Sequence, residues 1–331
     1  MIHPIPPGSR DVLPEEMRER RRLHQDLIDV FEARGYGEVA TPAIEYDEVL
    51  SRGDGRAAAS AYRFFDESGK LLALRSDMTV PIARLVASRY DGAEMPLRFS
   101  YLATSYRAVR PQRGQMREFA QAGVELIGAP APQGTAEVVE VLEAALDAVG
   151  LNRAVIGLGD ADLFRQLLTE LGVEGEARDA VIARLATHDL VGLEAELTAI
   201  AGISEEQCAT CVALSQLRGG REVLEQARGL GGAAVERATA RLLETYEELE
   251  RRGVADRVQI DLGLLHDLGY YSGAILEVYD PALGYVLGGG GRYDGLLQRF
   301  GVDQPAAGFA LYLERVRLAQ IEEERRGGEG R

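Results

Sequence analysis

The sequence predicts an α+β fold in which a helical insertion interrupts a β-sheet. Residues 96–107 and 118–128 alternate apolar and polar side chains with the period of two that strands show. From Asp160 to about Asp256 apolar residues recur with helical spacing, and strand-like segments return afterwards. We therefore expect a discontinuous core of residues 1–159 and 257–320, an inserted helical domain of residues 160–256, and a flexible tail of residues 321–331.

Composition and charge narrow the class of protein. The chain has 331 residues, of which 46% are hydrophobic, and can bury a large core. It contains no run of 18 apolar residues and no export signal at its start, so we expect a cytoplasmic protein. A formal net charge of -16 argues against a broad nucleic-acid-binding surface, although it permits a local basic pocket.

The first elements follow from periodicity and from Gly and Pro. Residues 14–34 carry one apolar helical stripe, and Gly35 is placed to end the helix. Pro42 interrupts the next short strand, which is typical of an edge, a bend or a subunit contact. Residues 62–77 read as a hairpin with its turn at Ser68 and Gly69. The stripe consists of Leu23, Leu27, Val30 and Phe31.

The strand at 118–128 offers two different faces. One face consists of small and apolar side chains, which the core should bury, and the other resembles a pocket floor. On that second face an amide and a carboxylate lie no more than about 13 Å apart at ~3.3 Å per residue, with a glycine between them. The expected core face is Ala120, Ala122, Val124 and Leu126, and the expected pocket face is Phe119, Gln121, Gly123 and Glu125.

The inserted segment gives no sign of a metal or a cofactor. Its two cysteines, Cys208 and Cys211, form a lone CxxC without a second pair, which is too little for a structural zinc site. They lie in a predicted helix with Ser204 as its N-cap and Gln207 completing a capping box. We expect no cofactor and no bound metal.

Several short motifs each have a functional and a structural interpretation. The run GGGGRYDG at 288–295 fits a phosphate-cradling loop or a plain turn into a helix. Tyr270 and Tyr271 are adjacent, so on a regular strand only one of them could line a cleft. Asp77 is either a ligand-binding acid or a helix cap, and His266 is more typical of a structural histidine than of a catalyst.

Residues 105–125 place four arginines and no acid between Arg107 and Arg117. Like charges so close together repel one another unless they are solvated or face an anion. The segment is therefore either a solvated surface loop or an anion-binding loop.

Taken together and in order, these segments resemble the catalytic domain of histidyl-tRNA synthetase over about residues 5–320. The segments that carry the resemblance are PPGSRDVLP, GYGEVATPAIE, LRSDMT, YRAVRPQRGQMREFAQAGVE, LGYYSGAILE, GGGGRYDGL and PAAGFALYLER, the last ending at Arg315. The resemblance implies a class II aminoacyl-tRNA synthetase-like antiparallel sheet flanked by helices. It also implies a histidine pocket made of Asp77, Thr79, Arg107, Gln121, Glu125, Tyr270 and Tyr271.

The chain departs from that family where the family activates its amino acid. The family's catalytic arginine falls on His266, and its phosphate-binding arginine in the second motif falls on Gln115. A glutamate of the same motif falls on Val109, and Asp77 is one methylene shorter than the usual glutamate. Because adenylate formation needs fixed cations around the phosphates, we expect no catalytic residues and no amino-acid activation.

A synthetase core that keeps its amino-acid pocket and loses its activating residues resembles the regulatory subunits of ATP phosphoribosyltransferase. The resemblance implies a short-form ATP phosphoribosyltransferase catalytic subunit as partner and feedback inhibition by L-histidine in the first step of histidine biosynthesis. It also implies a homodimer within a hetero-oligomer. The chain stops after the Arg315 segment, so we expect no tRNA partner, and no membrane.

Three other functions remain open at this point. The first is a truncated but active histidyl-tRNA synthetase-like enzyme, and the second is an enzyme that transfers an activated amino acid to another acceptor. The third is an amino-acid-binding module without a partner. The first two require adenylate formation.

Overall fold

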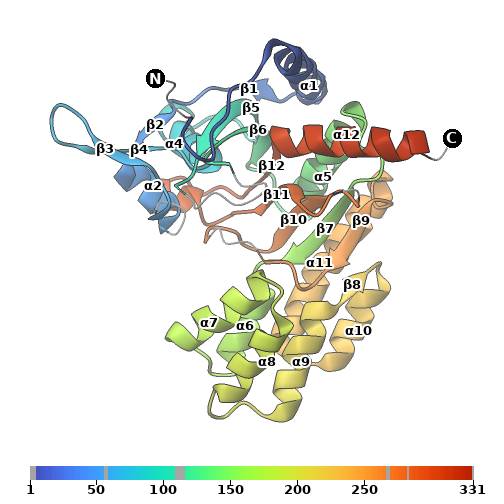
Figure 1. Ribbon diagram of the computed structural model, residues 1–331. Helices are drawn as coiled ribbons and strands as arrows, with labels where there is room; N and C mark the ends of the chain where they lie inside the picture. Colours follow the sequence, from blue (N-terminus) through green and yellow to red (C-terminus); the bar gives the residue numbers. More distant parts are fainter. Residues whose placement is uncertain (1–4, 56–58, 109–115, 266–268, 282, 330–331) are drawn as a thin grey trace.

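The computed structural model describes residues 5–55, 59–108, 116–265, 269–281 and 283–329. Within them, nine strands form one sheet in the order β1-β5-β6-β12-β11-β10-β7-β9-β8, and three form a small sheet in the order β2-β4-β3 (Figure 1). The large sheet contains β1 (Gly37–Glu38), β5 (Leu97–Tyr106), β6 (Glu118–Ile127), β7 (Val155–Asp160), β8 (Arg218–Gly219), β9 (Val258–Asp261), β10 (Ala274–Tyr279), β11 (Val286–Arg292) and β12 (Ala306–Tyr312).

The predicted α+β class is confirmed, but the sheet is mixed rather than wholly antiparallel. The six strands from β5 to β7 in the sheet order pair antiparallel. Strand β1 pairs parallel with β5, and β9 pairs parallel with β7. Strand β12 ends at Tyr312 and is followed directly by the last helix, which starts at Leu313.

Three helices cover one face of the large sheet: α1 (Pro14–Ala33), α5 (Gln133–Ala148) and α12 (Leu313–Glu329). The even-numbered residues 120–126 of β6 join the core cluster that holds Leu27 and Phe31, as predicted. Helix α1 ends before Gly35, whose φ of 78° lies in the left-handed region that glycine tolerates. Helix α12 continues to Glu329 and so includes residues 321–329 of the predicted flexible tail.

The small sheet lies beside the opposite face. It consists of β2 (Ile44–Tyr46), β3 (Arg63–Phe65) and β4 (Leu71–Leu74), and the predicted hairpin is the antiparallel pair of β3 and β4. Helices α2 (Asp47–Gly53) and α4 (Thr79–Arg89) pack beside it. A second core cluster joins this region to Phe99 and Tyr101 of β5 and to a 3₁₀ turn at Leu297–Phe300.

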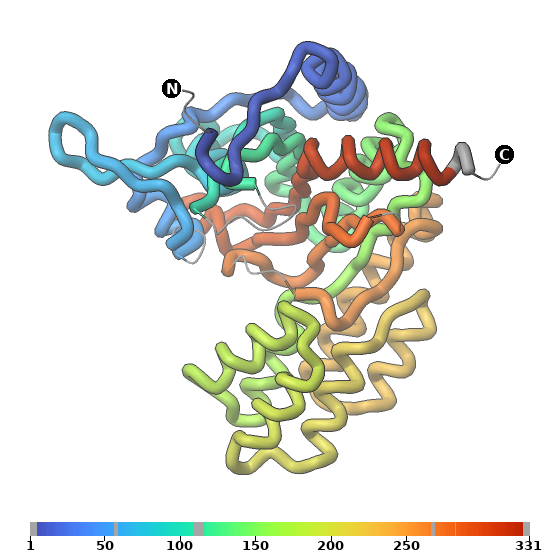
Figure 2. Tube along the Cα trace, in the orientation of Figure 1, coloured from blue at the N-terminus to red at the C-terminus, as the bar shows by residue number. Residues whose placement is uncertain are grey.

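The chain leaves the large sheet after β7, contributes the short edge strand β8, and re-enters the sheet at β9, the neighbour of β7 (Figure 2). The segment between them is helical except for β8, and Figure 1 shows it projecting from one end of the sheet. Its helices are α6 (Leu163–Glu170), α7 (Gly175–Ala186), α8 (Leu190–Ala199), α9 (Glu205–Gln216), α10 (Glu222–Leu230) and α11 (Ala233–Arg252). We call residues 163–252 the helical insertion; the predicted domain boundaries remain a prediction.

Helix α9 has the predicted capping box. Ser204 accepts a hydrogen bond from the Gln207 backbone N–H, and the Gln207 side chain accepts one from the backbone N–H of Ser204. The cysteines of this helix are buried and free. In the described ranges no group of three or more His, Cys, Asp or Glu side chains is arranged to hold a metal. None of the described helices is both long enough and apolar enough to cross a membrane.

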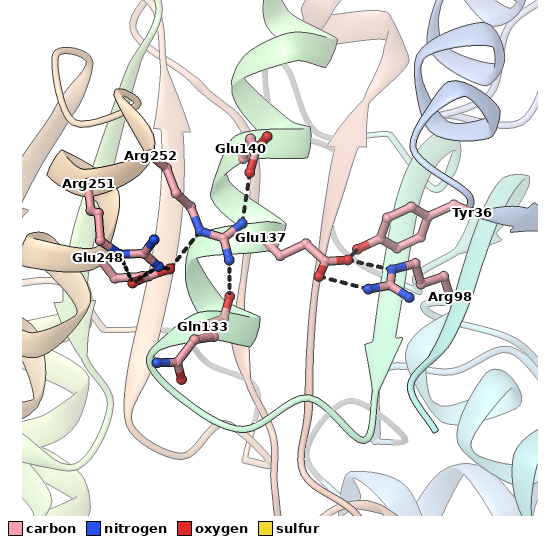
Figure 3. A network of polar contacts seen from close by, with 8 residues as sticks. All are labelled: Tyr36, Arg98, Gln133, Glu137, Glu140, Glu248, Arg251 and Arg252. Atoms are coloured by element: carbon pink, nitrogen blue, oxygen red, sulfur yellow. Dashed lines mark hydrogen bonds and ion pairs between the residues drawn. The ribbon is translucent and has the colours of Figure 1, made fainter. Parts of the chain in front are cut away.

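Helix α5 is clamped between the sheet and the end of the helical insertion (Figure 3). On one side, Glu137 accepts hydrogen bonds from Tyr36 at 3.0 Å and from Arg98 at 2.6 and 3.0 Å. On the other side, Arg252 of α11 donates to Glu140 at 2.8 Å and to Glu248 at 2.8 Å. Glu137 and Glu140, one turn apart on α5, therefore link this helix to the N-terminal part of the sheet and to the last inserted helix.

A second polar link joins α11 to the end of β7, and it should contribute measurably to stability. Arg241 donates to both carboxylate oxygens of Asp160, at 2.9 and 2.8 Å, and Asp160 is buried. We expect Arg241→Met to lower the free energy of unfolding by about 1–3 kcal/mol, because a buried carboxylate loses its cation. Urea denaturation measures this change.

The matched control is Arg221→Met, which removes an ion pair between α10 and Glu247 of α11 in which both side chains are half exposed. It should change the free energy of unfolding by less than about 1 kcal/mol. Equal losses in the two variants would contradict the expected difference between the buried and the exposed pair.

Candidate functional site

A cavity of about 260 Å³ lies over the face of the large sheet that points away from α1 and α5. Among the described residues, six of the seven expected pocket residues line it, namely Asp77, Thr79, Arg107, Gln121, Tyr270 and Tyr271. The seventh, Glu125, lies buried beneath them. The structure thus brings these residues together, and their role in binding histidine stays a prediction.

Small residues across the central strands make room for the cavity. In the pairing register, Tyr101 stands opposite Gly123, which is opposite Ala310, which is opposite Gly289 and then Glu277. Residues in register on neighbouring strands point to the same face. The floor of the cavity is therefore a row of small residues with Tyr101 at one end and Glu277 at the other.

The glycine run belongs to this floor. It forms strand β11, whereas the sequence allows a phosphate loop or a turn into a helix. A Cβ atom on Gly288 would lie 2.3 Å from the backbone oxygen of Ala310, and one on Gly290 would lie 2.1 Å from that of Gly308. Such contacts are too short for real atoms, so glycine is required because two backbones pack closely here.

Glu125 is the most deeply placed acid of the site. Its Oε1 atom accepts a hydrogen bond from the Thr79 hydroxyl at 2.7 Å, and its Oε2 atom accepts one from the Tyr293 hydroxyl. Burial raises the pKa of this carboxyl to about 8, although both hydrogen bonds favour the charged form. With this pKa, Glu125 is mostly protonated at pH 7.

Asp77 accepts a bond from the first turn of a helix and also lines the cavity, and its role as a ligand-binding acid stays a prediction. Its Oδ1 atom accepts the backbone N–H of Val80 in the first turn of α4, at 3.1 Å. The carboxyl is buried, and burial raises its pKa. A helix N-terminus favours an anion at this place, which gives the buried acid a fixed position.

Arg107 and Gln121 supply the positive charge and the hydrogen-bond donors of the site. The guanidinium of Arg107 lies 5.0 Å from the centroid of the Phe119 ring. Burial alone would lower the pKa of Arg107, but Tyr312 and Asp77 outweigh burial and raise it, so the cation persists at any ordinary pH. The side-chain oxygen of Gln121 accepts the Ser105 hydroxyl at 2.9 Å, which leaves its amide N–H groups as donors.

Both tyrosines of the adjacent pair line the cavity, as the family resemblance implies, and Tyr270 is also a buried member of the second core cluster. They precede strand β10 instead of belonging to it, so strand alternation does not separate their side chains. Their ring centroids are 4.9 Å apart, and the Tyr270 ring meets that of Tyr293 edge-on at 5.9 Å. The aromatic wall has three members.

Further lining residues that carry a hydroxyl or a charge were not among the expected site residues: Tyr101, Glu277, Tyr293, Tyr312 and Arg315. Arg315 donates to the backbone oxygen of Val286 at 2.6 Å, and its guanidinium lies 4.6 Å from the centroid of the Tyr312 ring. Burial raises the pKa of Glu277. Strand pairing brings Tyr101 and Glu277 to this face, and a single sequence read strand by strand does not reveal that pairing.

Part of the expected site falls outside the described residues. Val109, Gln115 and His266, where the activating residues of a synthetase would lie, are in this part, as are Arg110 and Arg113 of the arginine-rich loop. Of that loop's arginines, Arg107 and Arg117 are described, and the backbone of Arg107 bonds that of Arg117 at 2.9 Å.

The fold and the cavity define the class of protein as a histidyl-tRNA synthetase-like core, and comparison with known proteins agrees. A family model described as histidyl-tRNA synthetase matches residues 8–316. The ATP phosphoribosyltransferase regulatory subunit of Moorella thermoacetica is 41% identical over 96% of this chain and 82% of its own, and that of Desulforamulus reducens is 42% identical over 95% and 78%.

A solved structure from Bacillus halodurans, described as an ATP phosphoribosyltransferase regulatory subunit/histidyl-tRNA synthetase, has a TM-score of 0.88. It is 33% identical, over 97% of this chain and 84% of its own. The chain belongs to the family of ATP phosphoribosyltransferase regulatory subunits. The resemblance drawn from its ordered motifs is confirmed.

The raised pKa of Glu125 leads to a prediction about stability and pH. The folded state keeps this proton up to about pH 8, whereas an unfolded glutamate loses it near 4.5. The contribution of Glu125 to the free energy of unfolding therefore falls as pH rises through this window, by up to about 1.4 kcal/mol per unit. Glu125→Gln should abolish that fall and be more stable than the parent protein at pH 9, measured by urea denaturation from pH 5 to 9.

Exposed Glu118 of the same strand provides the control. Glu118→Gln should leave the pH dependence of the parent protein unchanged. A Glu125→Gln variant whose stability follows the same pH curve as the parent protein would contradict the presence of a neutral Glu125 carboxyl beneath the cavity.

Proposed function

We propose that this chain binds L-histidine in the cavity and, as the regulatory subunit of a short-form ATP phosphoribosyltransferase, confers feedback inhibition by histidine on the catalytic subunit. The observation that carries the proposal is the amphoteric lining of one cavity. A permanent cation, Arg107, lines it together with the buried acid Asp77, and a second buried acid, Glu125, lies beneath them. The names of the relatives support the partner.

The chemistry of the lining suits an amino acid with a basic side chain. A guanidinium such as Arg107 can hold an α-carboxylate through two parallel hydrogen bonds. A buried acid such as Asp77 can hold an ammonium, and Glu125 with Tyr293 can accept from or donate to an imidazole ring. Because burial keeps Glu125 protonated at pH 7, a cationic ligand would displace its proton.

We further propose that the cavity does not activate its ligand. A synthetase must meet the charge of the reacting phosphates with fixed cations, and two arginines of that family fall on Gln115 and His266 here. Arg315, which the cavity retains, already donates to the Val286 backbone. We therefore expect no aminoacylation and no tRNA partner.

Regulation requires histidine to bind the inhibited and the active state of the complex with different affinities. A difference of about 1–3 kcal/mol is typical of allosteric coupling. The coupling is reciprocal, so substrates of the catalytic subunit must change histidine affinity by the same factor. We propose a homodimer of this chain within the hetero-oligomer, as the similarity of its N-terminal segment to the dimer-forming motif of synthetases implies.

Direct binding tests the pocket. We expect Glu125→Ala and Gln121→Ala each to weaken histidine binding by about 5- to 100-fold in calorimetry, because each leaves a buried ligand group without its partner. The same variants should make the complex with the catalytic subunit less sensitive to histidine. Glu118→Ala on the same strand is the control and should bind as the parent protein does. Unchanged affinity in both pocket variants would refute the pocket.

Histidine-dependent exchange between pyrophosphate and ATP distinguishes regulation from activation. The purified chain should show no exchange above background, whereas an active synthetase-like or amino-acid-transferring enzyme would show it at an ordinary turnover rate. A positive result would refute the non-catalytic assignment even if histidine binds.

A further inference from the structure

The two tyrosines of the aromatic wall lie on a short connection that no strand holds. Residues 269–273 precede β10, and we call them the tyrosine segment. Gly273 has a φ of 70°, a conformation that other residues adopt only with strain. Because neither a strand ladder nor a helix fixes this backbone, its hydrogen bonds, together with the packing of the Tyr270 and Tyr271 rings, determine where the two side chains lie.

The core holds the first part of the tyrosine segment. The backbone N–H of Gly269 donates to Asp54 at 3.1 Å, and that of Ser272 donates to the backbone oxygen of Arg292 at 2.8 Å. The Ser272 hydroxyl in turn accepts the backbone N–H of Asp294 at 3.0 Å.

The start of the helical insertion holds the second part. The backbone N–H of Gly273 donates to Asp162 at 3.2 Å, and Arg165 donates to the backbone oxygen of Tyr271 at 3.3 Å. The backbone N–H of Ala161 donates to the oxygen of Gly273 at 2.7 Å. Three bonds thus tie the tyrosine segment to residues 161–165.

Asp162 is notable for what it does not bond. It is the N-cap residue of α6, a position where an aspartate ordinarily accepts an N–H group of its own helix. Its side chain makes no capping bond in the structure and reaches to Gly273 instead. Asp162 thus bonds the tyrosine segment instead of capping its own helix.

Packing does not replace these bonds. A second cavity of about 200 Å³ lies at this corner, lined by Asp160, Asp162, Arg241, Ser272 and Gly273 among others. The last inserted helix, α11, reaches the same corner through the bond from Arg241 to Asp160. Because the space between α11 and the tyrosine segment is not filled, side-chain packing there cannot fix the segment.

We propose that Asp162 and Arg165 are positioning residues for Tyr271, and that the placement of the helical insertion thereby sets the affinity of the main cavity for its ligand. This inference rests on the proposed function for the identity of that ligand. Neither residue lines the main cavity, so each acts through the backbone of the tyrosine segment. A partner that shifts the helical insertion would change affinity by this route.

The test is calorimetry of L-histidine binding to the full chain. Asp162→Ala and Arg165→Met should each weaken binding by about three- to tenfold, the loss typical of one hydrogen bond. Asp162→Asn should bind within about twofold of the parent protein, because its amide oxygen can still accept the Gly273 N–H. Arg184→Met, which removes an exposed ion pair within the helical insertion, is the control and should not change affinity. Circular dichroism and thermal unfolding verify that each variant is folded.

Hydrogen exchange gives a second measurement. In the parent protein, saturating histidine should slow amide exchange in α6, and the slowing should be absent in Asp162→Ala at equal occupancy. Parent-like binding by both Asp162→Ala and Arg165→Met, or a loss that Asp162→Asn fails to restore, would overturn the inference while leaving the proposed function standing. Unchanged exchange in the parent protein would overturn it as well. A parent protein that does not bind histidine would overturn both.

Discussion

The close approach of backbones at the centre of the large sheet is the constraint on which the site depends. A Cβ atom on Gly123 would lie 2.1 Å from the backbone oxygen of Phe309, and one on Gly308 would lie 2.1 Å from the carboxylate of Glu125. Because these positions carry no side chain, β6, β12 and β11 can bring the cavity floor down to the backbone. Glu125 of β6 is then buried and accepts hydrogen bonds from the hydroxyl groups of Thr79 and Tyr293 instead of lying in solvent. The charge state of the site, its aromatic wall and its attachment to the helical insertion all follow from this shallow floor.

Burial gives the acids of the cavity their chemical character. An exposed glutamate would be charged at neutral pH and would attract any cation weakly, whereas Glu125 keeps its proton until a suitable partner displaces it. Arg107 keeps its charge despite burial because Tyr312 and Asp77 stabilise it. Under the proposed function, such a site would select for a ligand that carries both signs at fixed separation, because a simple cation or a simple anion would leave one buried group unmatched.

Local patterns in the sequence were sufficient for elements whose signals lie close together in the chain. The stripe and the terminal glycine located α1, the box at Ser204 located α9, and alternation separated the two faces of β6. Local sequence patterns did not predict features that depend on pairing between strands far apart in the chain. Strand β12 joined an apolar segment to a helix without a turn between them, and Tyr101 and Glu277 reach the cavity through strand register. Strand alternation alone would allow only one tyrosine of the adjacent pair to line the cavity, but the pair lies before the strand, so both line it.

The parallel pairing of β7 with β9 has a consequence for the helical insertion. Ile156 stands opposite Val258 and Leu158 opposite Ile260, so the chain exits at one end of the pair and re-enters at the other. Parallel neighbours cannot be joined by a tight turn and require a crossover of a dozen or more residues. The inserted helices therefore serve as the crossover itself, unlike a domain grafted between adjacent ends of a hairpin. If the inserted helices were removed and replaced with a short loop, the chain could not reach the start of β9 from the end of β7, and the parallel pair could not form. Cutting the chain within the inserted helices would leave both strands able to pair.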